Sequence, residues 1–349
     1  MKRYLLVFIF LGLLNSLHGQ TIEGVVYDAD TKKEIPGVVV YLNGTSIHTV
    51  SNNDGYFCLT AGSKINTALV ISHLSYESIA IDNPFEHNEK VFFLKEKVNT
   101  LAQVVVVPDQ FSRDEKMKVF KEQFLGEGRG GRSCVILNEE DIVLNFDRQT
   151  NRLIGSSKNR IMIENKYLAY TIIFDLHSFS IQYSQNSMDN RYMERFSIMG
   201  TYALIDKNPN NHVIRNRRDE IYHHSRQYFW KNFIANTLKE AKFKIYNHNK
   251  QIEIDQYFTV ANTPPHTLVQ IRSGTNLSRI SSRLTNADIF GVISISNNNR
   301  YTSEAIFLTD HFSIDQFGNI SAPGNVIFAG DMAQQRIGDV LPLDFSGTP

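Results

Sequence analysis

Short apolar segments separated by turn residues make up the chain between residues 21 and 97. The segments cover 22–27, 38–42, 56–59, 68–71 and 91–94. An Asn-Asn-Asp-Gly run at 52–55 is typical of a tight turn, because these residues tolerate a positive φ. No part of this region keeps a helical period. Many short strands at this spacing predict a β-sandwich.

Two later segments have a helical pattern. Residues 112–125 predict a charged helix with one apolar stripe, formed by Met117, Phe120, Phe124 and Leu125. Further along, residues 229–241 predict one long amphipathic helix with a single buried stripe. The members of that stripe are Phe229, Trp230, Phe233, Ile234, Thr237, Leu238 and Ala241. We expect its aromatic side chains to belong to the core and not to a cofactor site.

Strand-like segments lie between these two helices. They cover 133–137, 142–146, 167–176 and 192–204. Near the C-terminus, a turn at 317–319 between apolar segments 312–315 and 326–330 predicts a hairpin. We therefore predict that residues 112–349 form an α+β domain with mostly antiparallel strands.

The first residues have the composition of a secretory signal peptide. Lys2 and Arg3 precede an apolar run at 5–14, and small or polar residues follow up to Gly19. The run is shorter than the roughly 18–20 residues that a membrane anchor needs. We expect residues 1–19 to be removed on export, with no transmembrane span in the mature chain.

Several motifs in the strand-rich region occur in a fixed order. They are Gly24-x-Val26-x-Asp28, Ile35-Pro36-Gly37-x-x-Val40, Thr49-x-x-x-x-Asp54-Gly55-x-Phe57-x-Leu59 and Leu69-x-Ile71-Ser72-His73-Leu74-Ser75-Tyr76. Together they resemble the carboxypeptidase regulatory-like domain, although Ser75 replaces the family's usual glycine. The resemblance implies a transthyretin-like sandwich of about seven strands over residues 20–97. Such domains begin many secreted Bacteroidetes proteins.

Residues 98–111 form a connector in this scheme, since 101–107 resembles the segment that closes the domain in TonB-coupled transporters. Two segments of the α+β domain also resemble uncharacterised secreted Bacteroidetes proteins. They are Asn216-Arg217-Arg218-x-x-Ile221-Tyr222-x-x-Ser225-x-x-Tyr228-Phe229 and the run from Phe312-x-Ile314-Asp315-x-x-Gly318-Asn319 to Arg336-x-x-Asp339-x-Leu341-Pro342. This second resemblance implies no activity.

The charge balance limits the classes of partner. Thirty-six basic residues balance thirty-six acidic ones, which gives a formal net charge of zero. A chain without a basic field is a poor match for a nucleic-acid backbone, and it has no polybasic run for an anionic lipid surface. We expect a protein or glycan partner at the cell envelope, and the sequence leaves the oligomeric state open.

Motifs for common catalytic chemistry are missing from the sequence. No histidine has a glutamate three residues later, H-E-x-x-H is absent, and so is the G-x-S-x-G elbow. We therefore predict no zinc-carboxypeptidase activity, no metal and no cofactor. A glycine-rich run at 126–131 lacks the lysine of a phosphate-binding loop, so we interpret it as a flexible linker, with anion contact by Arg129 and Arg132 as the alternative.

Two cysteines, Cys58 and Cys134, are too few for a disulfide framework. In the family pattern Phe57 and Leu59 point inward, so strand alternation places Cys58 on the outer face. An exposed thiol is unusual in an oxidising compartment. We expect Cys58 to be covered by another part of the chain or bonded to Cys134.

One polar cluster is a candidate binding site. Arg217, Arg218, Tyr222 and Ser225 directly precede the predicted long helix. Ser225 suits the N-cap position, where free N–H groups and the helix dipole favour an anion. The structural alternative is that the two arginines form ion pairs with Asp219, Glu220 or other acids of the body.

The predicted function is that of an exported binding or anchoring protein without catalytic activity, located in the periplasm or at the outer membrane. Its partner or ligand would engage the C-terminal domain. The competing hypothesis is a hydrolase with an unrecognised active site in the same domain. Its candidate residues would be Arg217, Arg218, Asp219, Glu220, His223 and His224.

Overall fold

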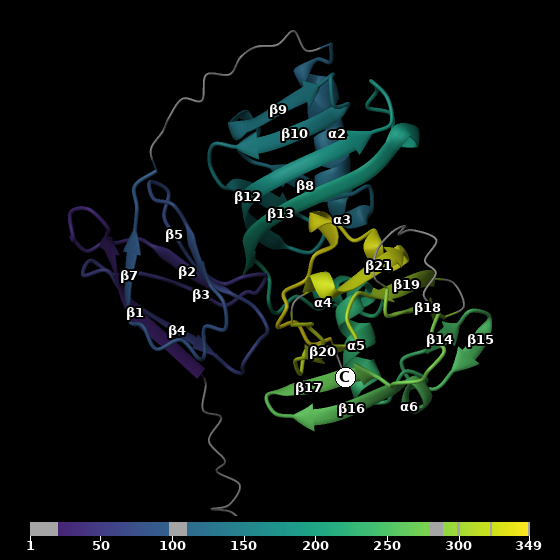
Figure 1. Ribbon diagram of the computed structural model, residues 1–349. Helices are drawn as coiled ribbons and strands as arrows, with labels where there is room; N and C mark the ends of the chain where they lie inside the picture. The colour runs from purple at the N-terminus through teal and green to yellow at the C-terminus, as the bar shows by residue number, and fades with distance from the viewer. Residues whose placement is uncertain (1–19, 98–109, 279–288, 299–300, 322, 348–349) are drawn as a thin grey trace, which may run out of the picture.

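The computed structural model describes residues 20–97, 110–278, 289–298, 301–321 and 323–347 (Figure 1). Its N-terminal domain has seven strands in two sheets. One sheet has the order β4-β1-β7 and the other β3-β2-β5-β6. The strands are β1 (Gln20–Asp28), β2 (Val39–Leu42), β3 (His48–Val50), β4 (Tyr56–Ala61), β5 (Leu69–Ser72), β6 (Ile79–Ile81) and β7 (Val91–Leu94). The predicted strand count is confirmed.

Strand alternation builds the core of this domain. In β4 the side chains of Phe57, Leu59 and Ala61 are buried, while those between them face outward. They pack in one cluster with residues of the opposite sheet, such as Val40 and Ile71. The two sheets therefore share one apolar interior.

The prediction for Cys58 is half right. Its side chain is on the outer face of β4 as expected, but it is exposed and unbonded. Cys134 is also free and lies in β8 of the C-terminal body. The expectation that Cys58 is covered or disulfide-bonded is wrong, because its sheet face is left open to solvent.

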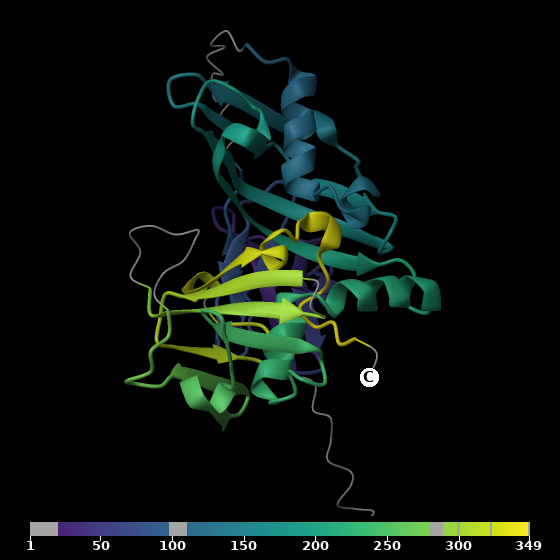
Figure 2. The same ribbon diagram turned by 90° about the vertical axis from the view of Figure 1, so that its right-hand side faces the viewer.

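The C-terminal body starts with a helix on a six-stranded antiparallel sheet (Figure 2). The helix is α2 (Arg113–Leu125), which matches the predicted helix and is capped by Ser112. The strands are β8 (Cys134–Ile136), β9 (Ile142–Asp147), β10 (Arg152–Ser157), β11 (Ile161–Asn165), β12 (Tyr170–Tyr183) and β13 (Met193–Asp206). Phe120 and Phe124 of α2 contact Phe179 and Phe174 of β12, with ring centroids 4.7 and 5.0 Å apart. The apolar stripe of α2 thus covers one face of this sheet.

Two helices, α4 (His212–Tyr222) and α5 (Arg226–Ile234), lead into the second half of the body. Two further sheets follow, with orders β15-β14-β18-β19-β21 and β16-β17-β20. Their elements are β14 (Phe243–Asn247), β15 (Lys250–Ile252), α6 (Ile254–Tyr257), β16 (Phe258–Thr263), β17 (His266–Ile271), β18 (Gly291–Asn297), β19 (Tyr301–Phe307), β20 (His311–Ile314) and β21 (Val326–Gly330). All strand pairs within the described body are antiparallel, as predicted.

Helix α5 lies between these two sheets. The Trp230 ring is 5.2 Å from that of Phe312 in β20 and 6.1 Å from that of Phe328 in β21. Phe233 contacts Phe258 of β16, with centroids 5.2 Å apart. These aromatic side chains are core, as the sequence pattern indicated.

The predicted long helix over 229–241 is corrected by the structure. α5 ends at Ile234, and turns occupy the chain up to β14. Asn236 adopts φ +55°, and a residue in this left-handed conformation stops a helix. The later members of the stripe, such as Leu238, are in the turns instead, where Leu238 is still buried.

Two other expectations about local structure are also wrong. The segments 312–315 and 326–330 form no hairpin, because β20 pairs with β17 and β21 pairs with β19 in another sheet. The glycine-rich run is no linker. It contains α3 (Arg129–Arg132), and Gly130 packs so closely on the carbonyl of Gly338 that a Cβ has no room.

The N-terminal domain is docked on the body through backbone bonds. The amide of Gly44 donates to the carbonyl of Tyr202 over 2.7 Å, and the amide of Leu204 donates to that of Thr45 over 3.0 Å. Beside them, Tyr41, Val70 and Ala203 pack in a small buried cluster. The turn after β2 therefore extends the edge of β13, and both domains form one unit.

Among the described residues, no helix combines the length and hydrophobicity that a bilayer span requires.

Candidate ligand-binding cavity

Arg218, a predicted site residue, is part of the core. Its side chain is 6% exposed. The guanidinium donates to both carboxylate oxygens of Asp206 over 2.6 and 2.8 Å, and to the carbonyl of Leu168 over 2.8 and 3.0 Å. Burial by itself would raise the pKa of Asp206, but the hydrogen bonds from Arg218 and from the amide of Asn208, together with the charge of Arg218, lower it. Arg218 therefore forms the kind of structural ion pair that the sequence left as the alternative to a binding role, and its acidic partner is Asp206.

Arg217 and Tyr222 also have structural contacts. Arg217 donates to the carbonyl of Tyr167 over 3.2 Å and lies over the Tyr167 ring, 4.9 Å from its centroid. Tyr222 is buried against Tyr228 and Phe345, and burial raises its pKa. Its hydroxyl has no hydrogen-bond partner among the described residues. A binding role for these residues stays a prediction.

Ser225 is the N-cap of α5, as predicted. Its hydroxyl accepts a hydrogen bond from the amide of Tyr228 over 3.0 Å. Of the four predicted site residues, it alone lines the cavity described below. The predicted anion-favouring helix start is therefore present, but Arg217 and Arg218 are engaged elsewhere.

The residues of the hydrolase hypothesis form no recognisable catalytic arrangement in the contacts of the described chain. The side-chain amide of Asn297 donates to the carbonyl of His223 over 2.9 Å and is 3.2 Å from Nδ1 of His224. Within the described ranges, no group of three or more His, Cys, Asp or Glu residues is placed to hold a metal ion. The hydrolase hypothesis stays untested.

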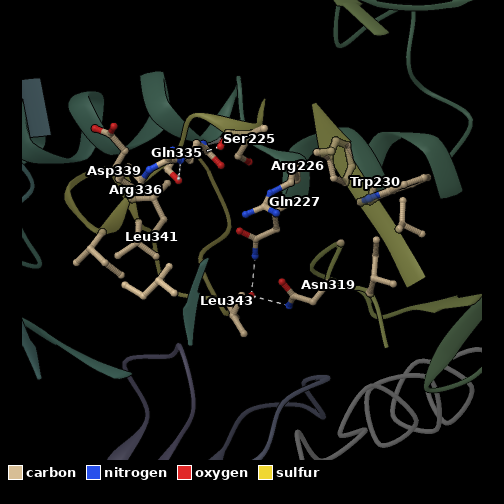
Figure 3. Close-up of a pocket in the computed structure, with 18 of the residues that line it drawn as sticks. Ser225, Arg226, Gln227, Trp230, Asn319, Gln335, Arg336, Asp339, Leu341 and Leu343 are labelled. Carbon is tan, nitrogen blue, oxygen red and sulfur yellow. Dashed lines mark hydrogen bonds between the residues drawn. The ribbon is translucent and has the colours of Figure 1, made fainter. Parts of the chain in front are cut away.

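A cavity of about 930 Å³ lies between the N-terminal domain, the sheet that contains β13, and the second half of the body. Its wall combines the middle of β13, the first turns of α5, segments between Gly318 and Leu343, and Asn66 of the N-terminal domain (Figure 3). Most of the lining is apolar. The apolar members are Phe124, Phe196, Ile198, Ile221, Trp230, Ile320, Val326, Ile327, Phe328, Ala333, Ile337, Val340, Leu341 and Leu343. Such a lining with a few polar groups is usual for small-molecule sites.

Arg226 projects into this cavity (Figure 3). It is the first residue of α5, directly after the cap. The side chain is accessible to solvent in the cavity, yet surrounding protein desolvates the guanidinium and lowers its pKa. Its Cζ atom is 5.7 Å from the centroid of the Phe328 ring. No hydrogen bond or ion pair joins Arg226 to another described residue.

Arg336 is the second cation of the cavity. Its Nη1 donates to the carbonyl of Ala333 over 2.8 Å, and its Cζ is 5.0 Å from the centroid of the Phe196 ring. Burial lowers the pKa of Arg336, and repulsion by Arg226 lowers it further. Both cations therefore line the same cavity.

Asp339 is the single acid among the described lining residues, but it faces away from the arginines (Figure 3). The amide of Gly130 donates to its carboxylate, which packs against the glycine-rich run. Burial raises the pKa of Asp339 despite this bond. The carboxylate forms no ion pair with Arg226 or Arg336, so the cavity keeps an excess of positive charge.

Side-chain amides close the wall beside the N-terminal domain. Gln227 and Asn319 both donate to the carbonyl of Leu343, over 2.6 and 3.0 Å. Asn66 donates to the carbonyl of Asn319 over 3.2 Å. These bonds satisfy the amide groups of Gln227, Asn319 and Asn66 and connect the N-terminal domain to the rim.

Comparison with protein families identifies the first domain. Residues 22–106 match the model of the CarboxypepD_reg-like domain. The match covers the seven-stranded domain, as the sequence motifs predicted. No curated protein matches the chain.

Two solved structures are similar to parts of the chain. A protein of unknown function from Bacteroides fragilis is 13% identical, with 54% of this chain and 82% of that chain covered and a TM-score of 0.17. A 9R-lipoxygenase from Cyanothece is 7% identical, with 66% of this chain and 49% of that chain covered and a TM-score of 0.18. At these values neither similarity supports an inference about the fold or activity of the body behind the CarboxypepD_reg-like domain.

The sequence predicted that the N-terminus of α5 favours an anion, but it did not predict the cavity. That prediction placed the anion next to Ser225 and assigned Arg217 and Arg218 to it. Arg226, the residue directly after the cap, was the sequence signal that could have identified the cation of this site. Arg336 is distant in the sequence, and no local pattern connects the two cations.

Proposed function

We propose that this protein is an exported binding protein of the cell envelope, without catalytic activity, and that its C-terminal body holds a small ligand. The mature chain would begin near Gln20 and reside in the periplasm or at the outer membrane. The CarboxypepD_reg-like domain would support the body and complete the rim of the site. The hydrolase alternative gains no support from the contacts of its candidate residues.

The observation that carries this proposal is the cavity of about 930 Å³, which is at the upper end of the range of small-molecule sites. Its partly polar, partly apolar wall comes from segments far apart in the chain, so a ligand would stabilise their arrangement.

A cavity-filling variant tests the proposal. Ile198 of β13 lines the cavity on the same strand face as Phe196, so Ile198→Trp puts a larger ring system into it, whereas Ser184→Trp alters an exposed serine. The protein would be purified from the envelope fraction and its mass measured under native conditions. We expect a co-purified small molecule on the wild type and on Ser184→Trp, and little or none on Ile198→Trp. Equal occupancy of all three proteins, or no ligand on any, would contradict the proposal.

A further inference from the structure

The two cavity arginines differ from the structural arginine of the same body. Arg218 is held by both oxygens of Asp206, so its charge is compensated within the fold. Arg226 is instead exposed in the cavity, and no described residue supplies a carboxylate to it. Its guanidinium donors are therefore available to an anion that enters the cavity, and a charge-assisted bond from a guanidinium to a carboxylate or phosphate is stronger than a neutral hydrogen bond.

The position of Arg226 strengthens this bias. The side chain starts at the N-terminal turn of α5, where backbone N–H groups favour negative charge. Arg336 lines the same cavity. The cavity therefore offers an acidic group two guanidinium groups, whose forked donors suit carboxylate and phosphate geometry.

The remaining wall predicts what the acidic group is attached to. Phe196, Trp230 and Phe328 are aromatic, and most of the other lining residues are aliphatic. A cavity of about 930 Å³ has far more room than an inorganic anion requires. Apolar surface of this extent favours an apolar body on the ligand.

We infer that the cavity binds an amphiphilic anion, with its carboxylate or phosphate head group at Arg226 and Arg336 and its apolar part along the aromatic and aliphatic wall. This inference rests on the proposed function, which requires only that the cavity holds a ligand. It adds the chemical class, and it makes Arg226 the residue that distinguishes an anion from a neutral ligand of the same shape.

Trp230 provides the signal for a test, because it is the sole tryptophan of the chain and lines the cavity. Its emission would be followed while the full chain is titrated with dodecanoate, dodecyl phosphate, dodecanol, dodecyltrimethylammonium or inorganic phosphate, each below its micelle concentration. We expect the two amphiphilic anions to bind at least about tenfold more tightly than the neutral and cationic probes. Inorganic phosphate should bind far more weakly, because it lacks the apolar part.

Variants test whether Arg226 is responsible for the preference for an anion. Arg226→Gln should weaken dodecanoate binding by about 10- to 100-fold and leave dodecanol binding unchanged. Arg152→Gln, at an exposed arginine on β10, is the matched control and should behave as the wild type. The melting temperature of each variant checks that it folds. The comparison among probes uses the unaltered protein and does not depend on any variant.

The outcomes separate the two proposals. Equal affinity for dodecanoate and dodecanol would overturn the anion inference while the cavity remains a binding site. The same conclusion follows if a folded Arg226→Gln variant keeps its preference for the anion. If none of the probes changes the emission or the melting temperature, the anion inference fails, and the occupancy measured by native mass decides the proposed function separately.

Discussion

Replacing Arg218 by Met separates a structural role from a binding role for the predicted arginine cluster. Methionine keeps much of the apolar stem but removes all five donors. The carbonyl of Leu168 then loses two hydrogen bonds, and Asp206 loses its bidentate partner. Breaking a buried ion pair from one side costs about 3–5 kcal/mol. The Asp206 side chain is 25% exposed and water can reach it, so we expect the lower end, about 3 kcal/mol.

Urea unfolding followed by circular dichroism measures this loss. A decrease of about 3 kcal/mol corresponds to a melting temperature lower by roughly 6–12 °C for a domain of this size. The control is Arg217→Met, which removes one hydrogen bond from a half-buried side chain and should cost no more than about 1 kcal/mol. If Arg218→Met unfolds at the same urea concentration as the wild type, the ion-pair argument is wrong. Lost ligand binding at unchanged stability would instead make the cluster a site.

The same pair predicts a pH dependence. The folded state lowers the pKa of Asp206 below its ordinary value of 3.8. Its contribution is therefore complete above that value and is lost as the pH falls through the lower, folded-state pKa. The stability difference between the wild type and Asp206→Asn should shrink as the pH falls below about 4. A difference that grows on acidification would contradict the assignment.

Three further predictions concern the termini, the thiols and the glycine-rich run. Mass spectrometry of the protein from the periplasmic fraction should show a chain that begins near Gln20, and retention of residues 1–19 would refute export by cleavage. Thiol titration in denaturant without reductant should find two free thiols; in the native protein Cys58 should react quickly and Cys134 slowly, because burial raises the pKa of Cys134 to about 12. Gly130→Ala should destabilise the body by about 1–3 kcal/mol, since a methyl group collides with the Gly338 carbonyl, while Gly62→Ala, with nothing within 4 Å, should leave the melting temperature unchanged.

The sequence predicted those features that depend only on residues a few positions apart, such as strand alternation, a helical stripe and a helix cap. Strand alternation placed Phe57 and Leu59 inside and Cys58 outside, and the apolar stripe of α2 was visible without a structure. Ser225 could be assigned as a cap because capping involves residues within one turn. Asn236, which follows the end of α5, was also a local signal, because asparagine favours turns. The apolar stripe that continues beyond Asn236 nevertheless predicted a longer helix.

Tertiary structure decided how these elements are combined. The segments 312–315 and 326–330 have strand patterns. The first pairs with β17 and the second with β19, and these partners are distant in the sequence, so a local pattern cannot predict them. The glycine-rich run resembles a linker until Gly338 is packed on it. Likewise, β2 and β5 bury both faces because the body covers the outer one.

The cavity is the clearest case of a feature that only the tertiary structure created. Arg226 and Arg336 are separate charges in the sequence, each with nearby acids that could have paired with them. Folding turns Asp339 toward Gly130 and gives Asp206 to Arg218, which leaves the two cavity arginines without a carboxylate among the described residues. Periodicity and capping act over a few residues, whereas the distribution of ion pairs depends on which distant segments meet. The sequence alone therefore determined the seven-stranded first domain and the helix α2, and the fold decided where positive charge is available to a ligand.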